Sequence, residues 1–347
     1  MTRSVTATLV LIASVLGLLA VLGPASADIA TWRDDGWRTD FTRTTVALSE
    51  IISGGPPRDG IPPIDEPQFL PLRKIDSLDE REPVIRLEVA GVVRFYPLRV
   101  MTWHEIVNDT IAGRPVAITY CPLCNASIVF DRRLDDVVLD FGTTGLLRKS
   151  DLVMYDRQTD SWWQQFTGES IVGRYAGRHL AMIPSSVIAW KEAKAANPQA
   201  EVLIPPNPSL RPYGNNPYVG YDGRTEPYPL FRGDLPEGVD PMARVVIVRK
   251  SSGERAPVVK AVLLSHLRKI GSIRTDRLIL SWRPGVASAL DTAAIRSGRD
   301  VGAVEARDAE TGAELVHDTT FAFVLFAFHP DVPIETERGD LRLEPKQ

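Results

Sequence analysis

The chain has 347 residues, of which 44% are hydrophobic and 24% are charged, and its formal net charge is −4. The hydrophobic content excludes a disordered chain, and the slightly acidic balance argues against a nucleic-acid-binding protein, which needs a basic surface. Two cysteines are too few for a scaffold held together by several disulfides. They can form one bridge, one redox pair or half of a metal site.

The first 27 residues have the pattern of an export signal. Arg3 precedes an apolar run over 5–22, Gly23 and Pro24 end that run, and 25–27 (Ala-Ser-Ala) matches a small-x-small cleavage site. We therefore expect a mature chain that is exported, to the periplasm or the extracellular space. The apolar run is close to the ~20 residues that span a bilayer, so an uncleaved anchor is the alternative. No transmembrane span is expected after signal cleavage.

The segment that follows the signal, 28–83, is expected to be an N-terminal arm. Its stretch 53–63 is too rich in proline and glycine for a helix or a central strand, which predicts a loop or an extended wrap. From Val84 onward the pattern becomes β-rich. Strands over 84–89 and 92–96 are expected to form a hairpin around Ala90 and Gly91.

Further elements of the first lobe, 84–204, follow in chain order. Pro97 is favoured in the first turn of a helix, and apolar spacing predicts that helix over 98–107. A second helix is predicted over 187–196, where Asn197-Pro198 ends it. Strands are predicted over 116–120, 128–130, 137–141, 153–155 and 162–166.

Residues 205–241 contain nine prolines and five glycines. The four tyrosines in this stretch favour a packed crossover over a free tether, because flexible linkers are rich in Ser and Gly and lack aromatic residues. The apolar run 324–328 is predicted to be a buried strand or helix, and 336–347 forms a polar tail.

The stretch 242–335 looks like a second, degenerate copy of the first lobe. The segments 116–122 and 278–284 pair in sequence, with Arg283-Pro284-Gly285-Val286 in the place of Cys-Pro-Leu-Cys. Other matches occur in the same order: Ala126-Ser127 with Ala287-Ser288, Asp131 with Asp291, Asp156 and Thr159 with Asp308 and Thr311, and Asn197-Pro198 with His329-Pro330. We therefore expect a β-rich α+β fold of two similar lobes from an internal duplication, each with β-hairpins and one or two helices.

The candidate site is Cys121-Pro122-Leu123-Cys124, directly after a buried strand. A Cys-x-x-Cys spacing lets both sulfurs face one point, which suits a reversible disulfide or two ligands of one metal ion. Asn125 excludes a haem attachment site, which needs histidine there, and the chain has no second cysteine pair for a four-cysteine zinc site.

His104 is the best third group, because it lies on the predicted helix just before the cysteine strand. Two thiolates and an imidazole would suit copper or zinc. Taken alone, His104 is more often a packing or capping residue, and Glu105 on the same helix is most often a solvent-facing or turn residue. The cysteines themselves are equally consistent with a structural disulfide.

Six segments carry a family resemblance: 59–65 (Asp-Gly-Ile-Pro-Pro-Ile-Asp), 103–109 (Trp-His-Glu-Ile-Val-Asn-Asp), 119–125 (Thr-Tyr-Cys-Pro-Leu-Cys-Asn), 129–132 (Val-Phe-Asp-Arg), 155–162 and 216–218. They resemble the domain-of-unknown-function family numbered 3179. The resemblance implies a typically exported bacterial or archaeal protein, and it implies no assigned reaction.

Three functions follow as hypotheses. The first is a thiol-disulfide or metal-linked redox centre, in which Cys121 is the better-exposed sulfur, Cys124 the resolving sulfur or second ligand, and His104 an orienting, deprotonating or ligating group. The second is a non-catalytic ligand-binding protein with a structural disulfide. The third is a metal-binding chaperone without turnover. The partner would be a small molecule or a redox protein, and the sequence leaves open whether the protein is an enzyme.

Overall fold

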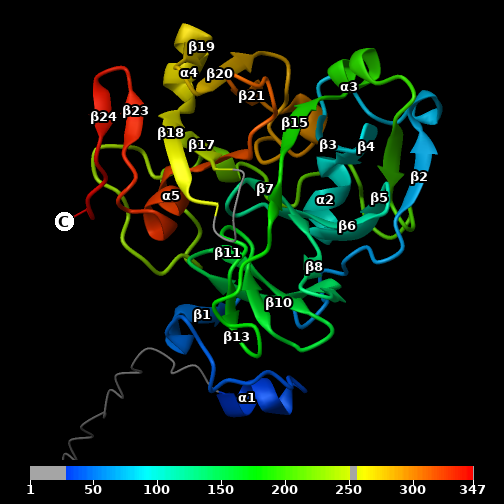
Figure 1. Ribbon diagram of the computed structural model, residues 1–347, viewed down its shortest axis with the longest axis vertical. Coiled ribbons are helices and arrows are strands. Elements are labelled where there is room, and N and C mark those ends of the chain that lie inside the picture. The colour runs from blue at the N-terminus through cyan, green and yellow to red at the C-terminus, as the bar shows by residue number, and fades with distance from the viewer. Residues whose placement is uncertain (1–28, 251–255, 347) are drawn as a thin grey trace, which may run out of the picture.

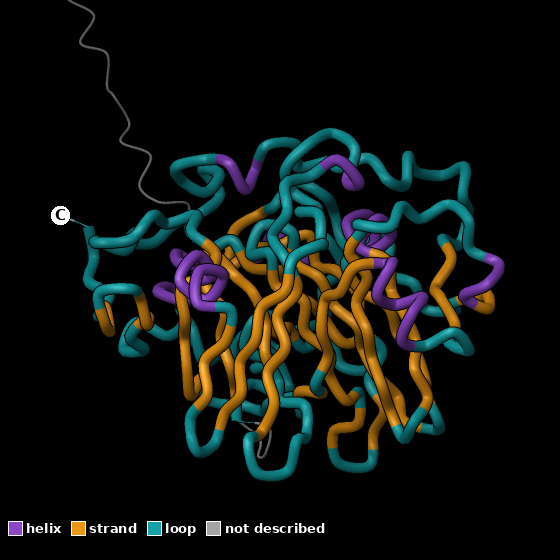
Figure 2. The backbone as a smooth tube through the Cα atoms, turned by 90° about the horizontal axis from the view of Figure 1, so that it is seen from above, coloured by secondary structure: helices purple, strands orange, loops and turns teal. Residues whose placement is uncertain are grey.

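The computed structural model describes residues 29–250 and 256–346, and the predicted signal peptide lies outside this part of the chain. Strands dominate, and the α-helices have only six or seven residues each. The fold is therefore β-rich with few helices, as the sequence predicts. The sheets surround the centre of the molecule in a propeller-like ring, with loops and short helices at its edges (Figures 1 and 2).

The predicted hairpin is confirmed as β3 (Pro83–Val89) and β4 (Val92–Pro97). Ala90 and Gly91 between them have φ of 48° and 79°, the left-handed backbone that a two-residue turn needs to match the twist of its strands. This hairpin is the centre of a five-stranded sheet. The order of that sheet is β15 (Ser185–Ala189), β3, β4, β16 (Glu201–Ile204) and β2 (Gln68–Pro71).

The chain then runs through α2 (Leu98–His104) into the sheet that contains the cysteines. The order of this sheet is β14 (Met182–Ile183), β7 (Ala126–Asp131), β6 (Arg114–Cys121) and β5 (Ile106–Ile111). The predicted strands 116–120 and 128–130 are the inner parts of β6 and β7. Strand β6 is buried almost along its whole length, which places the cysteines in the interior.

A third sheet packs beneath the first two. Its order is β1 (Ile51–Ser53), β10 (Phe141–Arg148), β11 (Asp151–Asp156), β12 (Trp162–Gln164) and β13 (Ser170–Val172). A two-stranded ribbon, β8 (Arg133–Leu134) and β9 (Val137–Val138), precedes it. The helix α1 (Ile29–Asp34) lies against this sheet through Trp32.

The second half of the chain forms two more sheets. One has the order β22 (His317–Phe321), β17 (Arg244–Arg249), β18 (Val258–Leu263), β23 (Ile334–Thr336) and β24 (Gly339–Leu341). The other has the order β19 (Ser272–Arg274), β20 (Leu278–Arg283) and β21 (Ala303–Asp308). The remaining helices are α3 (Trp190–Ala196), α4 (Leu264–Ile270), α5 (Ala322–Phe328) and the 3-10 turns Leu48–Glu50, Leu72–Lys74, Tyr221–Gly223 and Ile295–Ser297.

The two halves share an order of elements. The first runs β3-β4-α2-β5-β6-β7 and later β15-α3-β16, and the second runs β17-β18-α4-β19-β20-β21 and then β22-α5-β23. The strand orders β15-β3-β4-β16 and β22-β17-β18-β23 correspond, and the last strand is parallel to its neighbour in both. In these orders β20 occupies the position of β6, as the paired segments 116–122 and 278–284 predict.

One predicted correspondence lies on different strands. Asp156 and Asp308 each accept a hydrogen bond from the backbone N–H three residues later, at 2.7 and 2.8 Å. Asp156, however, ends β11, whereas Asp308 ends β21, whose position in the sheet order is that of β7. The two turns are alike because Asp and Thr cap such turns in many settings.

Both predicted helices of the first lobe are shorter than expected. The helix after Pro97 ends at His104, and the second begins only at Trp190, because 185–189 pairs with β3. Glu105 interrupts the first helix with a φ of 60°. The run 324–328 falls within α5, in agreement with the helical alternative.

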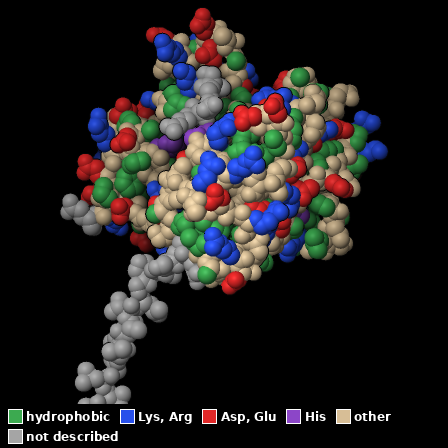
Figure 3. All heavy atoms as spheres, turned by 60° about the horizontal axis from the view of Figure 1, so that its bottom comes forward, with side chains coloured by type: hydrophobic (Ala, Val, Ile, Leu, Met, Phe, Trp, Pro, Cys, Tyr) green, Lys and Arg blue, Asp and Glu red, His purple; other side chains and the backbone are tan. Residues whose placement is uncertain are grey.

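The expected arm and tail both join sheets: 51–53 and 68–71 are β1 and β2, and 339–341 is β24. Acidic and basic side chains lie among one another on the face in Figure 3. Among the described residues, no helix has both the length and the apolar character needed to cross a bilayer.

Candidate metal centre

The cysteines lie at the two ends of the tight turn between β6 and β7. Cys121 is the last residue of β6, and the N–H of Cys124 donates to the carbonyl oxygen of Cys121 at 3.2 Å. Asn125 closes the turn with a φ of 52°. Both thiols are free, and the residues are 2% and 0% exposed. The structural disulfide expected as an alternative is therefore not present. Cys121 is the better-exposed of the two residues, as the redox hypothesis expects, but both are buried.

Asp151 completes a group of three potential ligands with the two cysteines. The Cys124 thiol donates to Asp151 Oδ1 at 3.4 Å, and the three ligand atoms lie within 4.8 Å of one another. The carbonyl oxygen of Ser150 lies 3.8 Å from Cys121 Sγ and 3.6 Å from Cys124 Sγ. Lys149 and Ser150 both have positive φ, and this turn between β10 and β11 directs the carboxylate toward the sulfurs.

The Asp151 carboxylate is fixed by its other oxygen. Oδ2 accepts hydrogen bonds from Gln164 Nε2 at 2.5 Å and from the N–H of Phe166 at 2.9 Å. Oδ1 is left to face the thiols. Outer hydrogen bonds of this kind orient metal-ligating carboxylates in known sites. The arrangement thus presents two sulfurs and one pre-oriented oxygen to a common point.

The charges around the thiols are acidic. Burial raises the pKa of both thiols, and it raises the pKa of Asp151 to about 6. The carboxylates that act on Cys121 are Asp151 and Glu105, which raise the thiol pKa further. Reactive cysteines usually have basic neighbours that stabilise the thiolate. This environment is the opposite, and it favours a bound cation over a free thiolate.

Glu105 belongs to this site, although the sequence favours a solvent-facing position for it. The residue is 5% exposed, and burial raises the pKa of its carboxyl to about 8. Its side chain hydrogen-bonds to Tyr218. Its φ of 60° is unusual for a residue other than glycine, and Gly271 occupies the corresponding position after α4 with a φ of 79°. The first half thus has a carboxylate where backbone geometry alone favours glycine.

His104 lies outside the group formed by the cysteines and Asp151. Its Nδ1 is 2.8 Å from the carbonyl oxygen of Pro62, and its Nε2 is 2.7 Å from the Tyr213 hydroxyl. Tyr213 also stacks on the imidazole ring. Both ring nitrogens therefore have hydrogen-bond partners. The partner of Nδ1 is in the N-terminal segment 28–83, and the partner of Nε2 is in the crossover 205–241. The next residue, Glu105, hydrogen-bonds to Tyr218 instead, and its carboxyl acts electrostatically on Cys121 and Asp151.

The second half and the crossover hold the cysteine turn in place. The Tyr221 hydroxyl donates to the carbonyl oxygen of Leu123 at 2.9 Å, and Thr320 Oγ1 donates to that of Cys124 at 2.8 Å. Asn125 Nδ2 donates to the carbonyl oxygen of Thr319 at 2.7 Å. The sequence contains no local signal for these contacts, since they join residues about 100 to 200 positions apart.

Comparison with known proteins finds one family. The model of the family described as Protein of unknown function (DUF3179) matches residues 58–332 and confirms the resemblance seen in the motifs. This range includes both cysteines, Asp151 and Glu105. No curated protein and no solved structure matches the chain.

Proposed function

The chain belongs to the family described as Protein of unknown function (DUF3179), and from the geometry of its own residues we propose that it binds one thiophilic metal ion through Cys121, Cys124 and Asp151. The observation that supports this most directly is the convergence of two thiols and a carboxylate oxygen within 4.8 Å in the protein interior. Zinc is the first expectation, because it takes sulfur and carboxylate oxygen together, and copper(I) is the alternative for so sulfur-rich a site.

The charge distribution supports a cation at this place. Buried charges are rare unless they are paired or coordinate a metal, and the site gathers Asp151 and Glu105 beside two ionisable thiols. The buried Arg249 guanidinium already acts electrostatically on Asp151, and a bound metal ion would add positive charge directly between the two sulfurs and the carboxylate. The role of such an ion would be to join β6, β7 and β11, three strands of two different sheets.

Thiol-disulfide exchange is the weaker candidate. It needs a sulfur that an external thiol can reach, whereas both cysteines are at most 2% exposed. Their proximity to each other would permit a bond between them, so oxidation is an outcome that the experiment below must detect.

The test is the metal content of the full chain after purification under reducing conditions and loading with zinc, and separately with copper(I). We expect about one equivalent of zinc or copper(I) in the wild type and a loss of at least tenfold in retained metal in Cys124→Ser and Asp151→Asn. Asp156→Asn is the matched control, because Asp156 is a fully buried aspartate on the same strand that lies outside the group. Circular dichroism of each variant establishes that it is folded.

Two results would contradict the metal site. One is equal metal content in the wild type and both ligand variants. The other is a wild-type protein that retains neither metal, with its two cysteines either titrating as free thiols or joined to each other.

We also propose that the chain is exported, on the strength of its first 27 residues. Expression of the full chain in a bacterial host, followed by fractionation and N-terminal sequencing, is expected to give a periplasmic or secreted product that begins at Asp28. A product that stays in the cytoplasm with residue 1 or 2 at its terminus would contradict this.

The internal duplication is the third proposal. The matching element order supports it, and so do the ends of the paired helices: Asn197 and His329 have φ of −136° and −142° with ψ of 64° and 61°. An experimental structure is expected to superpose β15-β3-β4-β16 with its helices on β22-β17-β18-β23. A superposition that requires a different strand order would overturn the duplication.

A further inference from the structure

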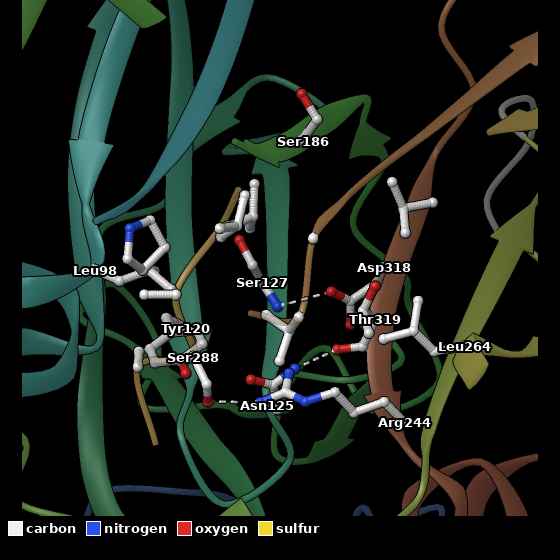
Figure 4. Close-up of a pocket in the computed structure, with 18 of the residues that line it drawn as sticks. Leu98, Tyr120, Asn125, Ser127, Ser186, Arg244, Leu264, Ser288, Asp318 and Thr319 are labelled. Carbon is white, nitrogen blue, oxygen red and sulfur yellow. Dashed lines mark hydrogen bonds between the residues drawn. The ribbon is translucent and has the colours of Figure 1, made fainter. Parts of the chain in front are cut away.

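A cavity of about 60 Å³ lies between the two halves of the molecule (Figure 4). Strands β6, β7 and β15 of the first half line one side, and β17, β21 and β22 of the second half line the other. Tyr120 and Ser127 are opposite each other on β6 and β7, so both side chains point to the same face of the sheet. The Cys121 side chain points to the other face of this sheet, because neighbouring residues of a strand point to opposite faces.

Four polar atoms of the cavity lining are buried without a hydrogen-bond partner among the described residues. They are Tyr120 Oη, Ser127 Oγ, Arg244 Nε and Asp318 Oδ2. Tyr120, Ser127 and Asp318 are 1%, 6% and 7% exposed. A buried polar group without a partner costs about 1–3 kcal/mol, and native proteins contain few of them. Four around one cavity indicate that something other than the protein completes their hydrogen bonds.

The rest of each side chain is held in position. Asp318 Oδ1 accepts from the N–H of Ser127 at 3.0 Å. Arg244 Nη2 donates to Asp222 Oδ2 and to Ser288 Oγ, both at 2.9 Å. Figure 4 shows Ser127, Asp318 and Arg244 gathered around the same space. The unpartnered atoms are therefore the free ends of groups whose orientation the protein has already fixed.

We propose that this cavity binds a small uncharged molecule that bears hydroxyl or amide groups. Arg244 Nε can only donate, Asp318 Oδ2 accepts when the carboxyl is ionised, and the two hydroxyls can do either. A ligand must therefore offer both donors and acceptors. Arg244 pairs with Asp222, which also pairs with Arg299 at 3.2 Å, and the charge of Arg249 acts on Asp318. The two charged groups of the cavity therefore each have a counter-charge within the protein, which favours an uncharged ligand.

The size of the cavity limits the ligand. A water needs about 10–15 Å³ on this measure, so 60 Å³ has room for about four or five waters or a molecule with a similar number of non-hydrogen atoms. A second pocket of about 350 Å³ shares Arg244, Leu264 and Val301 with the cavity. The two pockets therefore meet at Arg244, and a small molecule in the outer pocket would lie next to the cavity.

Glycerol and urea are suitable probes, as a neutral polyol and a neutral amide of this size. Binding to the full chain is measured by ligand-observed NMR titration. Tyr120→Phe and Ser127→Ala each remove one unpartnered atom, and Asp318→Asn replaces the acceptor Oδ2 by an NH2 donor while Oδ1 can still accept from Ser127. Each is expected to weaken binding by about 3- to 10-fold. Ser186→Ala is the matched control, because Ser186 lines the same cavity and its hydroxyl is not among the buried unpartnered atoms, and it is expected to stay within 2-fold.

The proposal is independent of the metal site, since none of the four groups belongs to it, and Cys124→Ser is expected to bind the probes as the wild type does. Saturable binding that Tyr120→Phe and Ser127→Ala weaken supports the proposal. Competition by acetate or trimethylammonium would overturn the assignment to uncharged molecules. Binding that is absent or equal in all variants, or a crystal structure grown with glycerol that shows ordered water only on the four groups, would overturn the site.

Discussion

Replacing Glu105 by Gln is expected to raise the free energy of unfolding of the metal-free protein at pH 8 by roughly 3–5 kcal/mol. Burial raises the pKa of the Glu105 carboxyl from 4.5 to about 8. Between these values the folded state holds a proton that the unfolded state has released, so the stability of the wild type falls as the pH rises from about 4.5 to about 8. Gln removes this titration and keeps a side chain that can hydrogen-bond to Tyr218.

The pH dependence distinguishes this effect from a general change in packing. Urea unfolding at pH 5 and pH 8 is expected to give a small difference between wild type and Glu105→Gln at pH 5 and the full difference at pH 8. Glu66→Gln, at an exposed glutamate, is the control and is expected to behave as the wild type at both pH values. Burial also raises the pKa of Asp318 to about 7, so a residual slope of the same sign remains in the variant. A difference that is the same at both pH values would contradict the assignment.

Replacing Trp162 by Ala is expected to lower the free energy of unfolding by about 3–5 kcal/mol, the usual cost of removing a large buried aromatic side chain. Trp162 is fully buried on β12. Its ring meets those of Trp32, Trp37 and Phe41 edge-on, with centroids 4.9, 5.2 and 5.3 Å apart. These three rings come from the segment before β1, so Trp162 is the anchor for that segment.

Denaturant unfolding measures the loss, and limited proteolysis locates it. Cleavage within 29–50 is expected to accelerate in Trp162→Ala more than cleavage elsewhere, because this segment loses its main apolar contact. Trp162→Phe is expected to restore part of both properties. Trp103→Ala is the control at a tryptophan that is not fully buried. Unchanged proteolysis of 29–50 with a full loss of stability would contradict the anchoring role.

Local sequence patterns predicted the elements that depend on neighbours along the chain. The β3–β4 hairpin followed from alternating residues around Ala90-Gly91, and the buried strand β6 followed from its continuous apolar run. The helix ends were less well predicted. The residue types at 187–189 are compatible with a helix or a strand, and these residues form a strand because they pair with β3. Glu105 ends α2 by adopting a backbone conformation that its residue type does not favour.

The residues of the candidate site also differ in whether a local sequence pattern predicts them. The pair Cys121 and Cys124 is evident from spacing, because a four-residue turn brings its own ends together. Asp151 comes 27 residues after Cys124 in a different sheet, and Glu105 lies between α2 and β5, one strand before the cysteine strand β6. The sequence places His104 and Glu105 on the same helix. Helix α2 ends at His104, which contacts Pro62 and Tyr213, whereas the carboxyl of Glu105 hydrogen-bonds to Tyr218 and acts electrostatically on Cys121.

By itself, then, the sequence determined the β-rich class, the family and the position of two cysteines on one turn, since these depend on composition and on short-range order. Only the tertiary structure decided that the thiols are buried beside acids instead of exposed for exchange. It also decided that a cavity with four unpartnered polar atoms lies on the other face of the cysteine strand. Burial and the pairing of polar atoms are set by segments that lie far apart in the chain, and no local pattern encodes where such segments meet.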